Sequence, residues 1–288
     1  MAEGSVPTSS QTALVLGGGG FTASSWITGL VVGMAEGGLD VRSADVLIGT
    51  SAGARVALQL ARGAPLEEVF ARQVGAAAHV GRPSAPLDWA HLQREVARAK
   101  ELGGDRSEIL RRIGQLALAH GGPDRRALVA SQLLLQEWPE RSVRLIALNA
   151  ETGVRRAFDR ESGIELVDAL MATTAFFGAA PVWFDGQPYI DGGFYSSDNA
   201  DLAAGCARVL VLALRAPPWA MRLVSLEAGV AELRASGAEV VVIQPDEEAM
   251  EAITSAGSPM NPAVFESATR AGRAQGLREV ARRGTSWW

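Results

Sequence analysis

Residues 46–57 read VLIGTSAGARVA, and this stretch decides the fold that we expect. An apolar run stops at Gly49, Ser51 stands between Gly49 and Gly53, and a helix-forming run begins at once. A G-x-S-x-G sequence between a strand and a helix is the pattern of a nucleophile elbow, whose strained turn exposes the serine hydroxyl. The amide groups at the start of the helix point toward the same spot. The pattern predicts a nucleophilic Ser51, and the alternative is an inert turn of small residues.

Strands and helices alternate around this corner. We predict strands at 12–16 and 45–49 and helices at 25–39 and 54–63. Short links between them imply a parallel sheet with right-handed crossovers. The later segments continue the pattern with a hairpin at 143–153 and 154–158, a helix at 164–177, two short strands around an Asp185-Gly186 turn within 182–193, strands at 208–215 and 239–245 with a helix between them, and a closing helix at 262–283.

The middle of the chain differs from its flanks. Residues 65–138 carry only helical patterns, which we interpret as an insertion lying over the sheet rather than as a separate domain. We therefore expect one α/β domain at 12–283, a flexible N-terminal tail at 1–11 and a C-terminal tail at 284–288. The 288 residues are 48% hydrophobic and 20% charged, which is ordinary for a globular protein of this size.

Charge and cysteine content exclude several classes of protein. The net charge of −5 gives no reason to expect nucleic-acid binding or strong attraction to anionic membranes. The single cysteine, Cys206, excludes an internal disulfide and a cysteine-based metal site. The first residues show no secretory signal, and no apolar run approaches the length of about 18 residues that a membrane-spanning helix needs. We expect a soluble, cytoplasmic protein.

A nucleophilic serine needs a base, and the histidines are poorly placed for that role. In α/β-hydrolases the histidine follows the later strands. Here the three histidines all lie in the helical middle, at His79, His91 and His120. Either Ser51 is inert, or its base is another kind of residue.

The sequence YIDGG at 189–193 offers such a base. Asp191 follows a short strand, and Gly192 and Gly193 let the backbone turn sharply and approach closely. Burial would raise the pKa of Asp191 above the usual value of about 3.9 and improve proton transfer. By itself, DGG is only a turn.

A run of glycines, LGGGG at 16–20, follows the first strand. Such runs often bind phosphate or dinucleotides, but position 23 is Ala instead of the third glycine, and a following GK[ST] is missing. The other use of a glycine turn is an oxyanion hole, in which each amide donor lowers the barrier by roughly 3 kcal/mol. A nucleotide-binding α/β protein has the glycine run as its only support.

Together these motifs resemble the patatin-like phospholipases, a family of lipid acyl hydrolases. The resemblance extends from about 12 to 205, and the matching segments are LVLGGGGFTASSW (14–26), DVLIGTSAGARVA (45–57) and MATTAFFGAAPVWFDGQPYIDGGFYSSDNADLA (171–203). It implies a three-layer α/β fold with a mostly parallel central sheet, helices on both faces and the helical insertion. It also implies a Ser–Asp dyad without histidine, which would solve the problem of the base.

The resemblance assigns a role to each motif residue. Ser51 becomes the nucleophile and Asp191 the proton acceptor. The oxyanion hole is assigned to Gly18, Gly19, Gly20 and Ala52, and the supporting motif glycines are Gly49, Gly53, Gly192 and Gly193. The chain departs from the family pattern at Thr22 and Ala23, where a basic residue and a glycine are common. These departures affect the loop and the pocket and leave the dyad intact.

The function that this reading predicts is a serine acyl-ester hydrolase acting on lipids, of the phospholipase A or lysophospholipase type. No cofactor and no metal are expected, and no calcium-loop pattern is present. The alternatives are a lipid acyltransferase and a non-catalytic lipid-binding protein on the same fold. The terminal TSWW could contact a membrane interface weakly, pack on the domain or be disordered. The sequence does not predict an oligomeric state.

Overall fold

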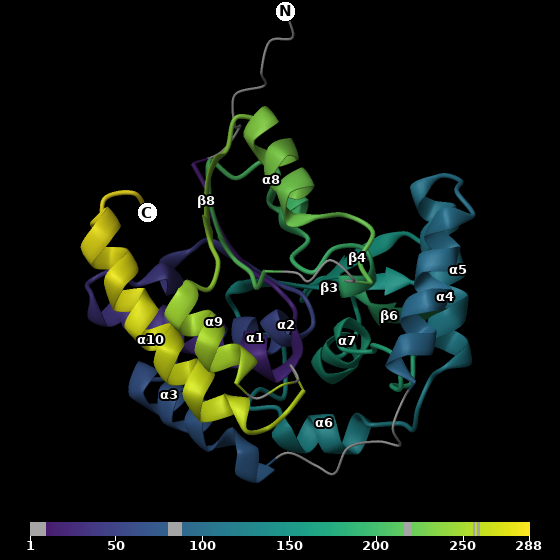
Figure 1. The fold of residues 1–288 in the computed structure, drawn as a ribbon, viewed down its shortest axis with the longest axis horizontal. Helices are drawn as coiled ribbons and strands as arrows, with labels where there is room; N and C mark the ends of the chain where they lie inside the picture. The colour runs from purple at the N-terminus through teal and green to yellow at the C-terminus, as the bar shows by residue number, and fades with distance from the viewer. Residues whose placement is uncertain (1–9, 80–87, 216–220, 256, 258–259) are drawn as a thin grey trace, which may run out of the picture.

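The computed structural model describes residues 10–79, 88–215, 221–255, 257 and 260–288, and these form an α/β fold around one sheet (Figure 1). The sheet has the strand order β5-β6-β3-β2-β1-β7-β8, and β4 pairs with β3. The strands are β1 (Thr12–Leu16), β2 (Val46–Gly49), β3 (Ser142–Asn149), β4 (Arg155–Phe158), β5 (Val182–Phe184), β6 (Gln187–Asp191), β7 (Arg208–Leu212) and β8 (Glu239–Ile243). From β3 to β8 in this order neighbouring strands are parallel, whereas the β3–β4, β3–β6 and β5–β6 pairs are antiparallel. The mostly parallel sheet and both hairpins therefore agree with the sequence analysis.

Helices and short 3-10 segments connect these strands. The helices are α1 (Gly20–Glu36), α2 (Ala52–Ala61), α3 (Leu66–Val74), α4 (Trp89–Glu101), α5 (Arg106–Ala119), α6 (Arg126–Gln132), α7 (Leu166–Thr173), α8 (Leu226–Ala235), α9 (Glu247–Thr254) and α10 (Val264–Arg283). The 3-10 segments are η1 (Val41–Ser43), η2 (Gly75–His79), η3 (Gly192–Phe194) and η4 (Ala200–Ala203). The first two helices begin earlier than the predicted 25–39 and 54–63, because the chain turns straight from each strand into its helix through backbone of positive φ.

The side chains of the central strands alternate between two apolar layers. Leu14 and Leu16 face the cluster that α1, α2, α7 and α10 cover, whereas Ala13 and Val15 face the cluster covered by α8 and η4. The described residues of 65–138, predicted as a helical insertion, contain α3, η2, α4, α5 and α6. Figure 1 shows α3 beside α10 at one side of the molecule and α4 and α5 beside β6 at the other. The insertion divides because each of its apolar faces meets a different part of the core.

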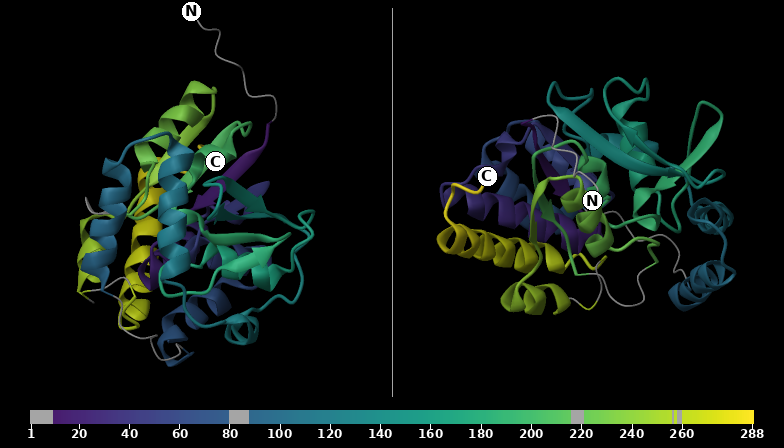
Figure 2. Two further views of the ribbon diagram at one scale, coloured as in Figure 1. Left: turned by 90° about the vertical axis from the view of Figure 1, so that its right-hand side faces the viewer. Right: turned by 90° about the horizontal axis from the view of Figure 1, so that it is seen from above.

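Glycines allow α1 and α10 to pack at close range. Seen from above, the two helices lie side by side (Figure 2). A Cβ atom at Gly29 or Gly33 would overlap the backbone of α10, and one at Gly272 or Gly276 would overlap the backbone of α1. The buried Trp26 indole also donates a hydrogen bond of 2.8 Å to Gln275 across the pair. The C-terminal helix is therefore fixed against the first helix of the fold.

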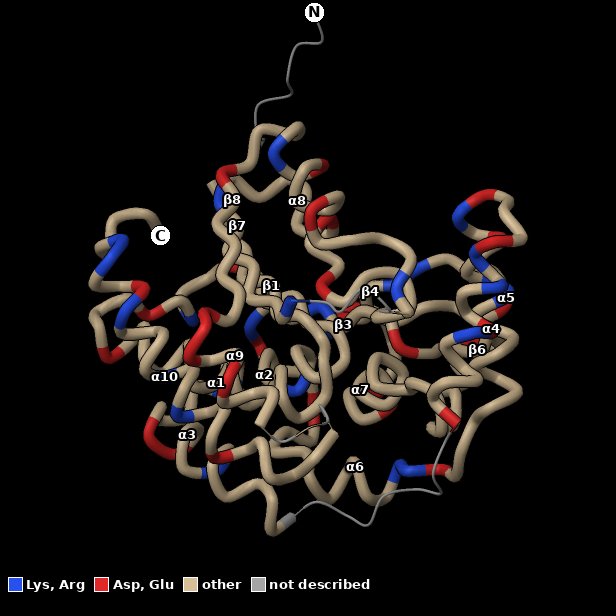
Figure 3. Tube along the Cα trace, viewed as in Figure 1, with Lys and Arg blue, Asp and Glu red and all other residues tan. Residues whose placement is uncertain are grey.

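The chain end packs on the domain, which was one of the alternatives for TSWW. Trp287 and Trp288 are partly buried against the core, and the Trp288 indole lies 3.3 Å from the Ser43 hydroxyl, to which it donates. Of the predicted N-terminal tail, residues 1–9 lie outside the described residues. Acidic and basic residues are interspersed over the helices that cover the sheet (Figure 3), consistent with the modest net charge. Within the described ranges, no helix combines the length and apolarity needed to cross a membrane.

Candidate active site

Ser51 occupies a strained corner between β2 and α2. Its φ of 54° and ψ of −116° lie outside the regions that residues with a Cβ usually adopt. Such a conformation costs about 1–3 kcal/mol and persists only where the surroundings enforce it. The Ser51 amide donates a 3.0 Å hydrogen bond to the Thr173 hydroxyl, which in turn donates 2.6 Å to the Ile146 carbonyl. This relay ties the corner to α7 and β3, so the serine hydroxyl is held at the carboxyl end of the sheet.

The two glycines flanking the serine have no room for a side chain. A Cβ at Gly49 would come within 2.5 Å of the Ala54 Cα, and one at Gly53 would overlap the Leu16 carbonyl oxygen. Strand β2, strand β1 and helix α2 therefore approach more closely than any larger residue would allow. The spacing of Gly49 and Gly53 around Ser51 is thus a packing requirement of the corner.

Asp191 reaches the same place from the end of β6. In the sheet β6 neighbours β3, which neighbours β2, and Asp191 lies opposite Ala147. The Asp191 side chain is buried and accepts a 2.7 Å hydrogen bond from the Gly193 amide, and the Ser51 hydroxyl lies close enough to it to lower its pKa. Two side chains that are 140 positions apart in the sequence are therefore in contact.

The environment of Asp191 shifts its proton affinity strongly. Burial raises the pKa of Asp191 to about 7, although the hydrogen bonds from Ser51 and Gly193 and the positive charge of Arg125 act in the opposite direction. A carboxyl group with such a pKa can exchange a proton near neutral pH. It is chemically suited to accept the proton of the hydroxyl that it contacts.

The glycine loop between β1 and α1 passes over the serine. A Cβ at Gly18 would lie 3.1 Å from the Ser51 Cβ. The Gly18 amide, however, donates a 2.7 Å hydrogen bond to the Ser197 carbonyl, so its assignment to an oxyanion hole does not fit this structure. In the described part of the chain, the amides of Gly19, Gly20 and Ala52 donate to no protein acceptor. The positive φ angles of Gly19 and Gly20, 138° and 64°, are what place these two amides in the loop.

The two histidines whose side chains the structure describes do not join this group. His91 is exposed on α4, and its ring centroid lies 6.3 Å from that of His120. The His120 Nδ1 atom lies 2.9 Å from the Leu116 carbonyl oxygen. Neither ring contacts Ser51 or Asp191 among the described interactions, and the side chain of His79 lies outside what the structure describes. Within these limits, Asp191 is the titratable group in contact with the serine.

The comparison with known families agrees with this arrangement. The model of the patatin-like phospholipase family matches residues 14–204, which is more than half of the chain. The chain belongs to the patatin-like phospholipase family. The match covers all three motifs: the glycine loop, the G-x-S-x-G corner and the DGG turn. The family and the mostly parallel α/β fold predicted from the sequence are thereby confirmed.

Solved structures give weaker likenesses to this patatin-like chain. It is similar to the type III effector ExoU of Pseudomonas aeruginosa, with 15% identity, a TM-score of 0.38 and coverage of 96% of this chain. It is also similar to VipD of Legionella pneumophila, with 15% identity, a TM-score of 0.36 and coverage of 85%. In both cases the match covers 54% of the other chain, so this chain spans about half the length of these structures. No curated protein matches the sequence.

One residue that supports the patatin-like site was missed by the sequence analysis. The Asn199 side-chain nitrogen lies 3.0 Å from the Thr50 hydroxyl and 2.7 Å from the Ser196 carbonyl, and its own φ is 52°. The Arg155 guanidinium group donates a hydrogen bond of 3.0 Å to the Asn199 side-chain oxygen. Asn199 therefore connects the serine corner with the segment after the DGG turn. The sequence signal that could have pointed to this position is the asparagine itself, because asparagine tolerates the left-handed backbone conformation.

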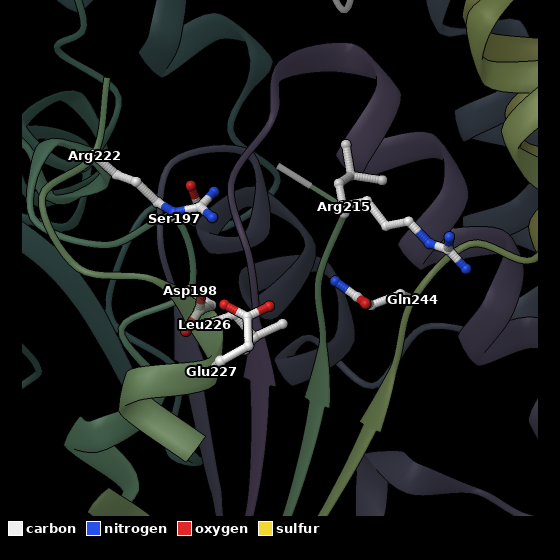
Figure 4. A pocket seen from close by; sticks show the side chains of 8 residues that line it. Ser197, Asp198, Arg215, Arg222, Leu226, Glu227 and Gln244 are labelled. Carbon is white, nitrogen blue, oxygen red and sulfur yellow. The ribbon is translucent and has the colours of Figure 1, made fainter. Parts of the chain in front are cut away.

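A polar pocket of about 270 Å³ opens beside the glycine loop (Figure 4). It is lined by Ser197, Asp198, Leu214, Arg215, Arg222, Leu226, Glu227 and Gln244. Figure 4 shows the acidic side chains near α8, the Arg222 side chain near Ser197, and Arg215 pointing away from them. The pocket adjoins the loop, because its wall includes Ser197, whose carbonyl binds the Gly18 amide. Among the described residues, no cluster of His, Cys, Asp and Glu could hold a metal ion.

Proposed function

We propose that this chain is a serine acyl-ester hydrolase acting on lipids, of the phospholipase A or lysophospholipase type. Membership of the patatin-like phospholipase family supports a lipid acyl hydrolase. The observation that carries the finer proposal is the contact between the Ser51 hydroxyl and the buried Asp191 carboxyl group, beneath a loop of free amides.

In the proposed reaction, the ionised Asp191 accepts the proton of Ser51 as the Ser51 oxygen attacks the ester carbonyl carbon. The carbonyl oxygen gains negative charge, and the amides of Gly19, Gly20 and Ala52 donate hydrogen bonds to it. Asp191 then returns the proton to the leaving alcohol as the carbon–oxygen bond breaks, which leaves an acyl-enzyme. Water repeats the sequence: Asp191 takes its proton, its oxygen attacks the acyl carbon, and the fatty acid leaves as Ser51 is reprotonated.

Two features of the corner favour this chemistry. The backbone strain at Ser51 fixes the direction of the hydroxyl, because the Thr173 hydrogen bond leaves the corner no easy relaxation. The start of helix α2 also directs its partial positive charge at the position where the oxyanion would form. Both effects are present before substrate binds, so they cost no reorganisation during the reaction.

A covalent probe tests nucleophile and base together. We expect a fluorophosphonate to label Ser51, labelling to disappear in Ser51→Ala, and both labelling and ester hydrolysis to fall about a thousandfold or more in Asp191→Asn. Ser131→Ala, on the exposed side of α6, is the matched control and should behave as the wild type. Equal turnover in Ser51→Ala and the wild type would contradict the proposal. Product analysis with and without an acceptor lipid separates hydrolysis from acyl transfer.

A further inference from the structure

Two arginine side chains, Arg55 and Arg125, lie on segments that adjoin the proposed dyad. Arg55 lies in the first turn of α2, four residues after Ser51, which precedes this helix. Arg125 precedes α6, and its charge is close enough to Asp191 to lower the pKa of that carboxyl group. The charge of Arg125 also lowers the pKa of Arg55, so the two guanidinium groups are within electrostatic reach of each other.

Neither guanidinium group has an anionic partner within the part of the chain that the structure describes. Among the residues that the structure describes, Arg55 and Arg125 form no ion pair with a carboxylate. Arg125 donates one hydrogen bond, of 3.2 Å, to the Thr174 carbonyl, and its Nε atom is buried without an acceptor. The next residue, Arg126, is by contrast paired with both Glu165 and Asp168. The described residues therefore supply a counter-ion to Arg126 and none to Arg55 or Arg125.

This arrangement is costly without a ligand. A buried N–H group that lacks an acceptor loses its hydration without compensation. Burial lowers the pKa of Arg55 to about 10, with a further contribution from Arg125, and burial also lowers the pKa of Arg125. Two like charges that disfavour each other's ionisation gain most from an anion placed between them.

We propose that Arg55 and Arg125 bind the phosphate group of a phospholipid substrate. Guanidinium groups match phosphate oxygens in geometry and can donate two parallel hydrogen bonds. In a glycerophospholipid only the glycerol unit separates the phosphate from the acyl esters. The proposal rests on the proposed function, since it names a feature of the substrate bound at the same site.

Apolar side chains adjoin the proposed phosphate site. Arg55 lines a cleft whose apolar wall is formed by Leu58 of α2, Leu170 of α7 and the three leucines at 133–135. Its other polar lining residues are Gln59, Arg72 and Gln132. A charged group beside an apolar wall matches an amphipathic ligand better than it matches a soluble phosphate ester. This position favours a lipid headgroup as the source of the phosphate.

The test compares two esters that differ in one group: a 1-acyl lysophosphatidic acid and the 1-monoacylglycerol of the same chain length, both in neutral detergent micelles. We expect the wild type to prefer the phosphate-bearing ester in kcat/KM by about tenfold or more. Arg55→Gln and Arg125→Gln should each lower this ratio about tenfold, as expected for the loss of a hydrogen bond to a charged group. The ratio within one variant does not depend on the fraction of protein that is folded.

Two other arginines serve as controls. Arg111→Gln removes a charge from the exposed side of α5 and should leave the ratio unchanged. Arg222→Gln removes a charge from the pocket of Figure 4. A ratio that falls in Arg222→Gln and not in Arg55→Gln or Arg125→Gln would place the phosphate in that pocket and overturn the proposal. A wild-type ratio near one would overturn it as well.

Binding measurements separate this proposal from the proposed function. If the wild type hydrolyses neither ester, the proposed function fails, and the phosphate site is then tested by calorimetric titration of Ser51→Ala with the lysophosphatidic acid. We expect Arg55→Gln or Arg125→Gln in that background to weaken binding about tenfold. Unchanged affinity would overturn the proposal. Inorganic phosphate, titrated in parallel, should bind far more weakly than the lipid; equal affinity would identify free phosphate as the ligand and would also overturn it.

Discussion

Replacing Asp191 by Asn should stabilise the protein increasingly above about pH 4 while it removes activity. The pKa of Asp191 is raised from 3.8 to about 7, so the folded state favours the neutral carboxyl group. The stability that this group contributes is fully present below pH 3.8 and is lost as the pH rises toward 7 and above. Asparagine has a similar shape and does not ionise, so the variant escapes this loss.

The size of the effect follows from the two pKa values. At 1.36 kcal/mol per pH unit, the gap between 3.8 and about 7 corresponds to roughly 4 kcal/mol. Asp191 is only 1% exposed, so solvent screens little of this penalty. The free energy of unfolding of Asp191→Asn minus that of the wild type should therefore be near zero at pH 4, rise through pH 5 and 6, and level off above pH 7.

Urea denaturation followed by tryptophan fluorescence at pH 4, 5, 6, 7 and 8 measures this difference. Asp185→Asn, in the exposed turn between β5 and β6, is the matched control for losing a surface carboxylate. Curves for Asp191→Asn and the wild type that run parallel over the whole pH range would refute the reasoning, because they would mean that Asp191 is not held in its neutral form by the fold.

Two further predictions concern the base and the helix packing. With a neutral ester, the wild-type kcat/KM should rise with pH around pH 7 as Asp191 loses its proton. Arg125→Met should move this rise to higher pH, because Arg125 lowers the pKa of Asp191. An unmoved or lower midpoint in a pH–rate titration of the variant would contradict this. Gly29→Ala should destabilise the protein by about 1–3 kcal/mol in urea denaturation, since its Cβ would overlap the Thr269 carbonyl oxygen. Gly75→Ala is the control and should leave the stability unchanged, because Gly75 has open space around it and a φ of −82°. Equal effects of the two substitutions would argue against close packing of α1 on α10.

The strands were predictable because each is a short apolar run that ends at a turn signal. The segment VLIG stops at a glycine, and TALVL runs into four of them, so β1 and β2 appear almost where expected. Helix α9 was missed because its residues Glu247–Thr254 are short and rich in acidic side chains. Its only clear signal is the cap at Asp246, whose side chain accepts a hydrogen bond from the Ala249 amide.

The contact between Ser51 and Asp191 cannot be predicted from local sequence patterns alone. Each residue is found from its own motif, but their meeting depends on β6 pairing antiparallel with β3, which in turn pairs with β2. No spacing in the sequence encodes that strand order. The same limit applies to Gly18, whose amide is taken by the carbonyl of Ser197, a residue far along the chain. Which amides of a glycine run stay free is decided by tertiary neighbours.

The proposed phosphate site and the proposed base are coupled through Arg125. In the free protein, the positive charge of Arg125 lowers the pKa of Asp191 against the larger effect of burial. A phosphate bound between Arg55 and Arg125 would offset that charge, so the pKa of Asp191 would rise once substrate is in place. A carboxylate with a higher pKa accepts a proton more readily from the Ser51 hydroxyl. At the same time, a higher pKa leaves less of Asp191 ionised at neutral pH, so binding a phosphate-bearing lipid would move the pH dependence of kcat to higher pH than that of a neutral ester.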